Sequence, residues 1–146
     1  MKRAAFLLSL VTLSATVSVD AKGITRRLVI SAPHLSEALE LTEPAGALAS
    51  VWGGEFLGAR ATVEPDPSWP RFAVAFYVQP PRRQEVKLAY TVTYVRDPNG
   101  GGFVYLPGIG EEGYRLNASA ILRRSQDGRW HHAGAAWSQA LNTRLP

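Results

Sequence analysis

The stretch 71–106, RFAVAFYVQPPRRQEVKLAYTVTYVRDPNGGGFVYL, decides the fold of this chain. From Arg71 to Gln79 every even position is large and apolar, which is the pattern of a strand with one buried face. The segment 86–96 repeats this alternation with residues that favour strands. The side chains expected to share one buried face are Phe72, Val74, Phe76, Leu88, Tyr90 and Val92.

Two reversals join these segments. Pro80-Pro81 cannot continue a strand ladder, and Asn99-Gly100 is the dipeptide that most readily forms a tight two-residue hairpin loop. We therefore expect a meander of three antiparallel strands, closed by the segment 103–106. Its expected cross-strand pairs all lie on this same buried face: Val78 with Val86, Phe76 with Leu88, Val74 with Tyr90, Tyr94 with Tyr105, and Arg96 with Phe103.

Weaker patterns extend the fold on both sides of the meander. The sequence predicts strands at 24–30 and 130–133, a return strand within 35–42, and helices at 45–52 and 135–141, the first beginning at Thr42-Glu43-Pro44. A helical turn is expected from Ser119 to Arg124. The fold class is therefore mainly β, or β-rich α+β: a single antiparallel curved sheet or a small sandwich, with a short internal helix and a C-terminal helix.

The N-terminus has the features of a secretory signal peptide. Met1 to Arg3 is basic, an apolar run follows to Val19, and Val19-Asp20-Ala21 provides a site with small residues for cleavage. We expect residues 1–21 to be removed and residues 22–146 to form a single β-rich domain without a membrane span. The short signal is typical of bacteria, so the expected destination is the periplasm or the extracellular medium.

Composition excludes several classes of function. The chain contains no cysteine, which excludes disulfides, thiolate metal sites and a cysteine nucleophile. The formal net charge is only +4, and the arginine pairs are scattered along the sequence, so no nucleic-acid partner is expected.

The histidines do not form a metal-binding pattern. His131 and His132 are adjacent, so on a strand they point to opposite faces, and His34 is far away in the sequence. No cofactor fingerprint and no Gly-x-Ser-x-Gly elbow occurs. We therefore expect no metal, no cofactor and no serine nucleophile.

The loop after the meander holds the best candidates for binding. Glu111 and Glu112 lie between glycines, and Tyr114 and Arg115 add a ring and a bidentate donor beside these carboxylates. A second candidate is a groove lined by arginine and aromatic rings, which would suit sugars, peptides or peptidoglycan fragments. The aromatic residues that suggest it are Trp52, Trp69, Tyr77, Trp130 and Trp137. The alternative is that the tryptophans fill the core of a small domain without disulfides.

The segments GFVYLPG at 102–108, YRLN at 114–117, RW at 129–130 and Trp137 together resemble a pattern of uncharacterised exported bacterial proteins. The resemblance implies a β-rich exported domain and no activity, cofactor or site. The leading hypothesis is a noncatalytic binding or interaction module of the envelope or medium, whose partner is an unknown protein or glycan. The alternative is a small exported hydrolase that uses Glu111 and Glu112 with a histidine.

Overall fold

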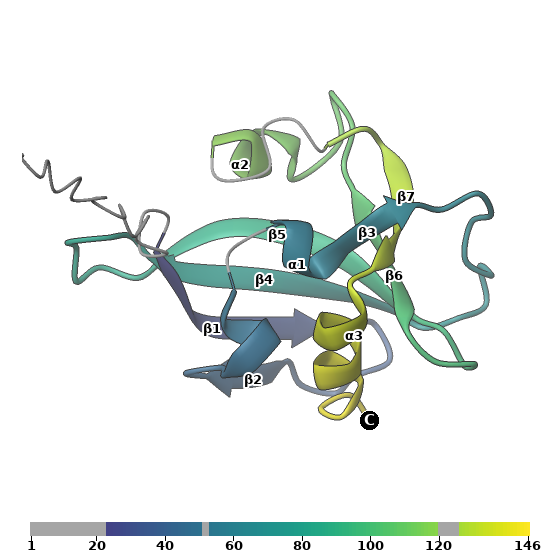
Figure 1. Ribbon diagram of the computed structural model, residues 1–146, viewed down its shortest axis with the longest axis horizontal. Helices are drawn as coiled ribbons and strands as arrows, with labels where there is room; N and C mark the ends of the chain where they lie inside the picture. Colours follow the sequence, from purple (N-terminus) through teal and green to yellow (C-terminus); the bar gives the residue numbers. More distant parts are fainter. Residues whose placement is uncertain (1–22, 51–52, 120–125) are drawn as a thin grey trace, which may run out of the picture.

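A computed structural model describes residues 23–50, 53–119 and 126–146 of the chain (Figure 1). The predicted signal peptide, residues 1–21, lies outside this range and stays a prediction. Within the described ranges, no helix has the length and apolar character needed to cross a membrane.

The described residues form one open antiparallel sheet of seven strands in the order β2-β1-β4-β5-β6-β7-β3. The strands are β1 (Ile24–Ser31), β2 (Leu39–Thr42), β3 (Leu57–Arg60), β4 (Arg71–Gln79), β5 (Lys87–Arg96), β6 (Gly102–Leu106) and β7 (Arg129–Ala133). The predicted meander is thus the centre of the sheet, β4-β5-β6. Of the two predicted architectures, the single sheet is the one observed, and the mainly β fold class is confirmed.

One face of this sheet carries the hydrophobic core, and we call it the core face. The predicted side chains of β4 lie here, with Phe72, Val74 and Phe76 at most 1% exposed. Helix α3 (Ala135–Asn142), helix α1 (Gly53–Phe56) and the 3-10 helix η2 (Gly46–Ala49) contribute further buried side chains to the same cluster. In Figure 1, α1 and α3 lie over one side of the strands, as this packing requires. The buried side chains that α3, α1 and η2 contribute are Trp137 and Leu141, Phe56, and Leu48, respectively.

The expected pairing of β4 with β5 is wrong by two residues. Phe76 lies opposite Tyr90, and a bulge between Phe76 and Tyr77 leaves Ala89 without a partner. A shift of two keeps the buried set on one face, but the bulge moves Leu88 opposite Tyr77 and leaves it 38% exposed. The face was predicted correctly for the other five residues and wrongly for Leu88.

The expected pairing of β5 with β6 is wrong by one residue, which has a larger effect. Arg96 pairs with Gly102 and Tyr94 with Val104, so the loop is longer than Asn99-Gly100. The Tyr94 hydroxyl donates to the Gly101 carbonyl, and a Cβ at Gly102 would overlap the Tyr94 ring. A one-residue shift exchanges the faces, so Phe103 and Tyr105 lie on the side opposite the core.

The C-terminal helix is confirmed, whereas the first predicted helix needs correction. No helix begins at Thr42-Glu43-Pro44, because Thr42 is still in β2 and Glu43 has a φ of 46°. Within residues 45–50 of this predicted helix, only the four residues of η2 are helical. Near Ser119 the helix is α2 (Tyr114–Ser119), which ends where a helical turn was expected to begin. The remainder of that turn, 120–124, and residues 51–52 of the first helix lie outside the described residues.

Helix α2 is attached to the sheet by a side chain that replaces a strand. The register that pairs Thr93 with Tyr105 would place Pro107 opposite Thr91, and proline has no N–H to donate. Asn117 supplies the missing groups. Its Oδ1 accepts from the Thr91 N–H at 2.9 Å, and its Nδ2 donates to the Thr91 carbonyl at 2.8 Å. Asn117 is fully buried, so both of these hydrogen bonds are shielded from water.

Candidate functional site

The face of the sheet opposite the core, here called the outer face, carries a continuous row of side chains across five strands. Consecutive members are cross-strand partners, from β1 through β4, β5 and β6 to β7. This outer row consists of Ser31, Ala73, Thr93, Tyr105 and Trp130. Its residues are small at β1 and β4 and large at β6 and β7, so a shallow floor ends at two rings whose centroids are 5.2 Å apart.

A second row runs beside the outer row and extends its aromatic end. It joins Arg71, Val95, Phe103 and His132 in consecutive cross-strand pairs. Val95 is fully buried, Phe103 is half-buried and His132 is exposed. The Phe103 and His132 rings are 5.1 Å apart. The outer face therefore presents adjoining rings at its β6 and β7 end.

The loop before β4 places one more ring at this surface. The Asp66 carboxylate accepts from the Ser68 hydroxyl at 2.6 Å and from the Ser68 N–H at 2.8 Å. These hydrogen bonds, the hydroxyl first, lower the pKa of Asp66 below its ordinary value. The turn carries Trp69, whose ring centroid lies 6.3 Å from that of Phe103.

Arg71 links this loop to the two rows. Its guanidinium donates to the Pro67 carbonyl at 2.8 Å and to the Trp69 carbonyl at 3.2 Å. Its guanidinium carbon also lies 5.7 Å from the centre of the Trp130 ring, within cation–π range. These contacts hold Arg71 beside the rings, and because its acceptors are neutral carbonyls the guanidinium keeps its positive charge at this surface.

A hollow of about 440 Å³ adjoins the small end of the outer row. Its floor includes Ala73 and Thr93, and Pro33 and Arg71 stand at its sides. A ligand that occupied it would reach Tyr105 next, since Tyr105 is the cross-strand neighbour of Thr93. The surface thus combines a shallow hollow, hydroxyl groups and rings.

The predicted binding loop meets the outer row through Glu111. Its carboxylate accepts from the Tyr105 hydroxyl at 2.8 Å and from the Gly108 N–H. Burial, and then the hydrogen bond to Glu111, raise the pKa of Tyr105 to about 12. Glu111 therefore fixes the Tyr105 ring and closes its own loop.

The side chains of the other three predicted site residues form no hydrogen bond with the Glu111 side chain within the described residues, although the Tyr114 N–H donates to the Glu111 carbonyl at 3.2 Å. Glu112 and Arg115 are exposed, and neither side chain has a hydrogen bond or ion pair within the described residues. Tyr114 is half-buried at the start of α2, where its carbonyl accepts from Gln126 Nε2 at 3.2 Å. The roles of Glu112, Tyr114 and Arg115 in binding stay predictions.

The three histidines contact residues other than Glu111 and Glu112. His131 Nε2 lies 3.1 Å from each Asp127 carboxylate oxygen, and the rings of His34 and His132 contact phenylalanines. Across the ranges 23–50, 53–119 and 126–146, no histidine forms a hydrogen bond with either glutamate. The same ranges contain no group of three side chains that could hold a metal ion.

The tryptophans divide between the two readings of the sequence. Trp137 belongs to the core, where it contacts Phe56 and Tyr94. Trp69 and Trp130 lie at the outer face, and Trp52 lies outside the described residues. Sequence reasoning missed Phe103 and Tyr105, because it placed them in the core. The residue that could have indicated the correct register is Gly102, because its lack of a side chain makes room for the Tyr94 ring.

Comparison of the chain with protein-family models, with curated proteins and with solved structures finds no match. No relative suggests a function for this face, so the candidate site is defined by its geometry alone.

Proposed function

We propose that this protein is an exported, noncatalytic binding module that holds a glycan on the outer face of its sheet. The observation that carries the proposal is the outer row, which ends in the paired rings of Tyr105 and Trp130. Sugar rings present apolar C–H faces and hydroxyl edges. Aromatic rings with a polar tip suit such ligands, because they supply apolar area together with hydrogen-bonding groups.

The charges around the outer row favour a ligand without a strong net charge. The guanidinium of Arg71 donates hydrogen bonds to two carbonyls. The carboxylate of Glu111 accepts hydrogen bonds from the Tyr105 hydroxyl and the Gly108 N–H. Thr93 contributes a hydroxyl to the floor of the row. One guanidinium and one carboxylate therefore border the rings without an excess of either sign, which suits a neutral sugar better than a strongly ionic peptide.

The site is also built in advance of binding. Trp69 is held by the Asp66 turn and by Arg71, and Tyr105 is held by Glu111. Side chains that are already ordered lose less conformational entropy when a ligand binds. Such order suits capture of a polymer, while the described residues offer no pairing of Glu111 or Glu112 with a histidine for hydrolysis.

Tryptophan fluorescence and calorimetry can test this proposal with three probes: triacetylchitotriose, cellotriose and purified peptidoglycan sacculi. We expect saturable binding of at least one probe, and a loss of about tenfold or more in affinity for Trp130→Ala, since a stacked ring contributes on the order of 1.5 kcal/mol. Tyr77→Ala is the matched control, because Tyr77 is on the same face outside the row, under Arg27. Failure to bind all three probes, or equal affinity of Trp130→Ala and wild type, would contradict the proposal.

A further inference from the structure

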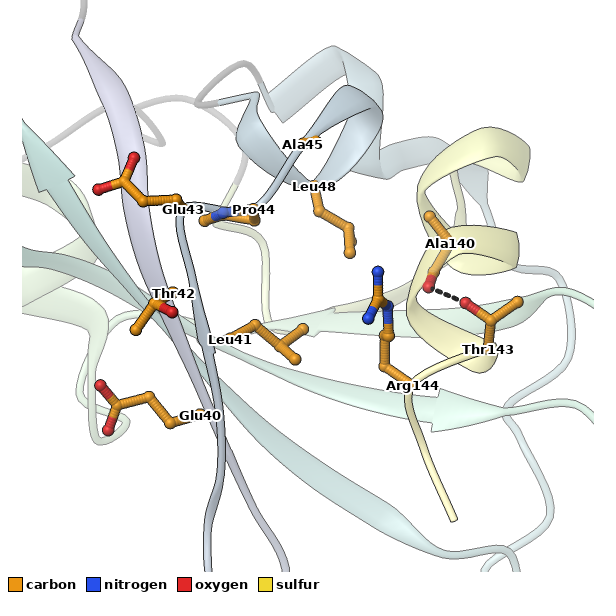
Figure 2. A pocket seen from close by; sticks show the side chains of 10 residues that line it. All are labelled: Glu40, Leu41, Thr42, Glu43, Pro44, Ala45, Leu48, Ala140, Thr143 and Arg144. Atoms are coloured by element: carbon orange, nitrogen blue, oxygen red, sulfur yellow. Dashed lines mark hydrogen bonds between the residues drawn. The ribbon is translucent and has the colours of Figure 1, made fainter.

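A second pocket lies away from the outer row, between β2, η2 and the end of α3 (Figure 2). Its volume is about 390 Å³. Apolar side chains form much of its lining: Leu41, Pro44, Ala45, Leu48 and Ala140. One cation, the exposed Arg144, lines this pocket, and in Figure 2 its side chain extends toward Leu48, beside Leu41.

The backbone that carries Arg144 is fixed on both sides. The N–H of Arg144 donates to the Leu141 carbonyl at 2.9 Å, and Leu141 is fully buried. The next residue, Leu145, is only 8% exposed and belongs to the core cluster. The facing wall is fixed as well, because Leu48 is 5% exposed. The pocket therefore does not depend on a free chain end.

The carboxylates near the pocket do not neutralise Arg144. Glu43 is paired with Arg26 at 2.8 Å and Glu40 with Arg27 at 3.4 Å. In Figure 2 both glutamates extend to the side of β2 away from Arg144. Within the described part of the chain, the guanidinium of Arg144 has no hydrogen-bond acceptor and no ion-pair partner.

We propose that this pocket binds an aliphatic carboxylate. The guanidinium presents parallel N–H groups that match the two oxygens of a carboxylate, and such charge-assisted pairs are the strongest hydrogen bonds of this kind. The aliphatic part of the ligand packs against Leu41, Leu48 and Ala140. This chemistry occurs in a free carboxylic acid and in the C-terminal carboxylate of a peptide that ends in an aliphatic residue.

Calorimetric titration of the full mature chain tests the pocket with two pairs of probes. The first pair is octanoate and octanamide, and the second is the peptide Gly-Gly-Leu with a free and with an amidated C-terminus. We expect a single saturable site for at least one carboxylate and at least tenfold weaker binding of its amide. Arg144→Gln should weaken carboxylate binding by about tenfold or more, because a hydrogen bond to a charged group is lost. Arg83→Gln, an exposed arginine in the β4–β5 loop, is the matched control and should bind like wild type.

The two probe pairs identify the source of the carboxylate. Tighter binding of octanoate points to a free acid, and tighter binding of the free peptide points to a chain terminus. The proposal is overturned if neither carboxylate saturates at millimolar concentration, or if Arg144→Gln, shown to be folded by circular dichroism, binds as well as wild type. The glycan proposal is independent of this result, because Trp130 and Arg144 line different surfaces.

Discussion

The two faces of one sheet place the same residue types in different surroundings: rings on the core face are packed, whereas rings on the outer face, where we propose that a ligand binds, stay partly exposed. On the core face, the rings of Phe76 and Tyr90 stack 4.3 Å apart, and both are fully buried. On the outer face, the rings of Tyr105 and Trp130 are 5.2 Å apart and only half-buried. The two faces differ because α1, α3 and η2 pack over the core face, whereas part of each ring in the outer row stays exposed.

Removing a ring from each face should give the largest contrast in stability. We expect Phe76→Ala to lower the free energy of unfolding by roughly 3 to 5 kcal/mol, because it leaves a cavity between packed rings. Phe103→Ala should cost about 1 kcal/mol, since its ring is already half exposed. Urea denaturation of both variants measures the difference. Equal losses for the two would show that the outer face is also a packed core.

Asn117 tests whether hydrogen bonds rather than apolar contacts hold α2 to β5. Asn117→Ala leaves the N–H and the carbonyl of Thr91 without their partner, so we expect a loss of about 1 to 3 kcal/mol in the free energy of unfolding. Asn99→Ala is the control, because Asn99 lies in an exposed turn and should change stability by less than about 0.5 kcal/mol. If Asn117→Ala is as stable as wild type, these two hydrogen bonds contribute nothing to the stability of the fold.

Alkaline titration compares a tyrosine from each face. Burial raises the pKa of Tyr94, on the core face, to about 12, and burial raises that of Tyr105, on the outer face, to the same value. Because the folded chain disfavours phenolate, the stabilisation is complete below about pH 10, the pKa of an unperturbed tyrosine, and is lost as the pH rises toward 12. Denaturation curves between pH 9 and 12 should show this fall.

The variants Tyr94→Phe and Tyr105→Phe separate the two contributions to the alkaline transition. Each should make stability less dependent on pH between 10 and 12, because each removes one titrating group. Absorbance of phenolate near 295 nm follows the same groups directly. Titration of every tyrosine near pH 10 in the folded protein would contradict the assignment.

The smallest expected effect on stability lies in the exposed loop beside the outer row. Glu112→Ala and Arg115→Ala together should change the free energy of unfolding by less than about 0.5 kcal/mol, because both side chains are exposed and neither forms a hydrogen bond or ion pair within the described residues. The predicted role of these residues is in binding, so the double variant should recover less partner from an envelope extract than wild type does. Unchanged recovery would show that this part of the loop is only a connector.

Much of the fold could be read from local patterns, because alternation requires no knowledge of neighbours. Val74 and Phe76 are buried as expected, and α3 forms where Trp137 and Leu141 recur on one side. The candidate site was less accessible to such reasoning. Glu111 was predicted as a binding carboxylate in the loop after the meander, a role that stays a prediction, and its hydrogen-bond partner Tyr105 had been placed on the buried face.

The sequence by itself determined the strands of the meander, most of their buried residues and the mainly β class, since these follow from period-two alternation and turn residues, but it left a single sheet and a small sandwich both open. Only the tertiary structure decided the register, because register depends on partners that are distant in sequence. One extra residue in the hairpin before Gly102 turned Phe103 and Tyr105 away from the core, and the bulge beside Phe76 exposed Leu88. The outer row exists because those shifts align side chains from five strands, and no single strand carries that information.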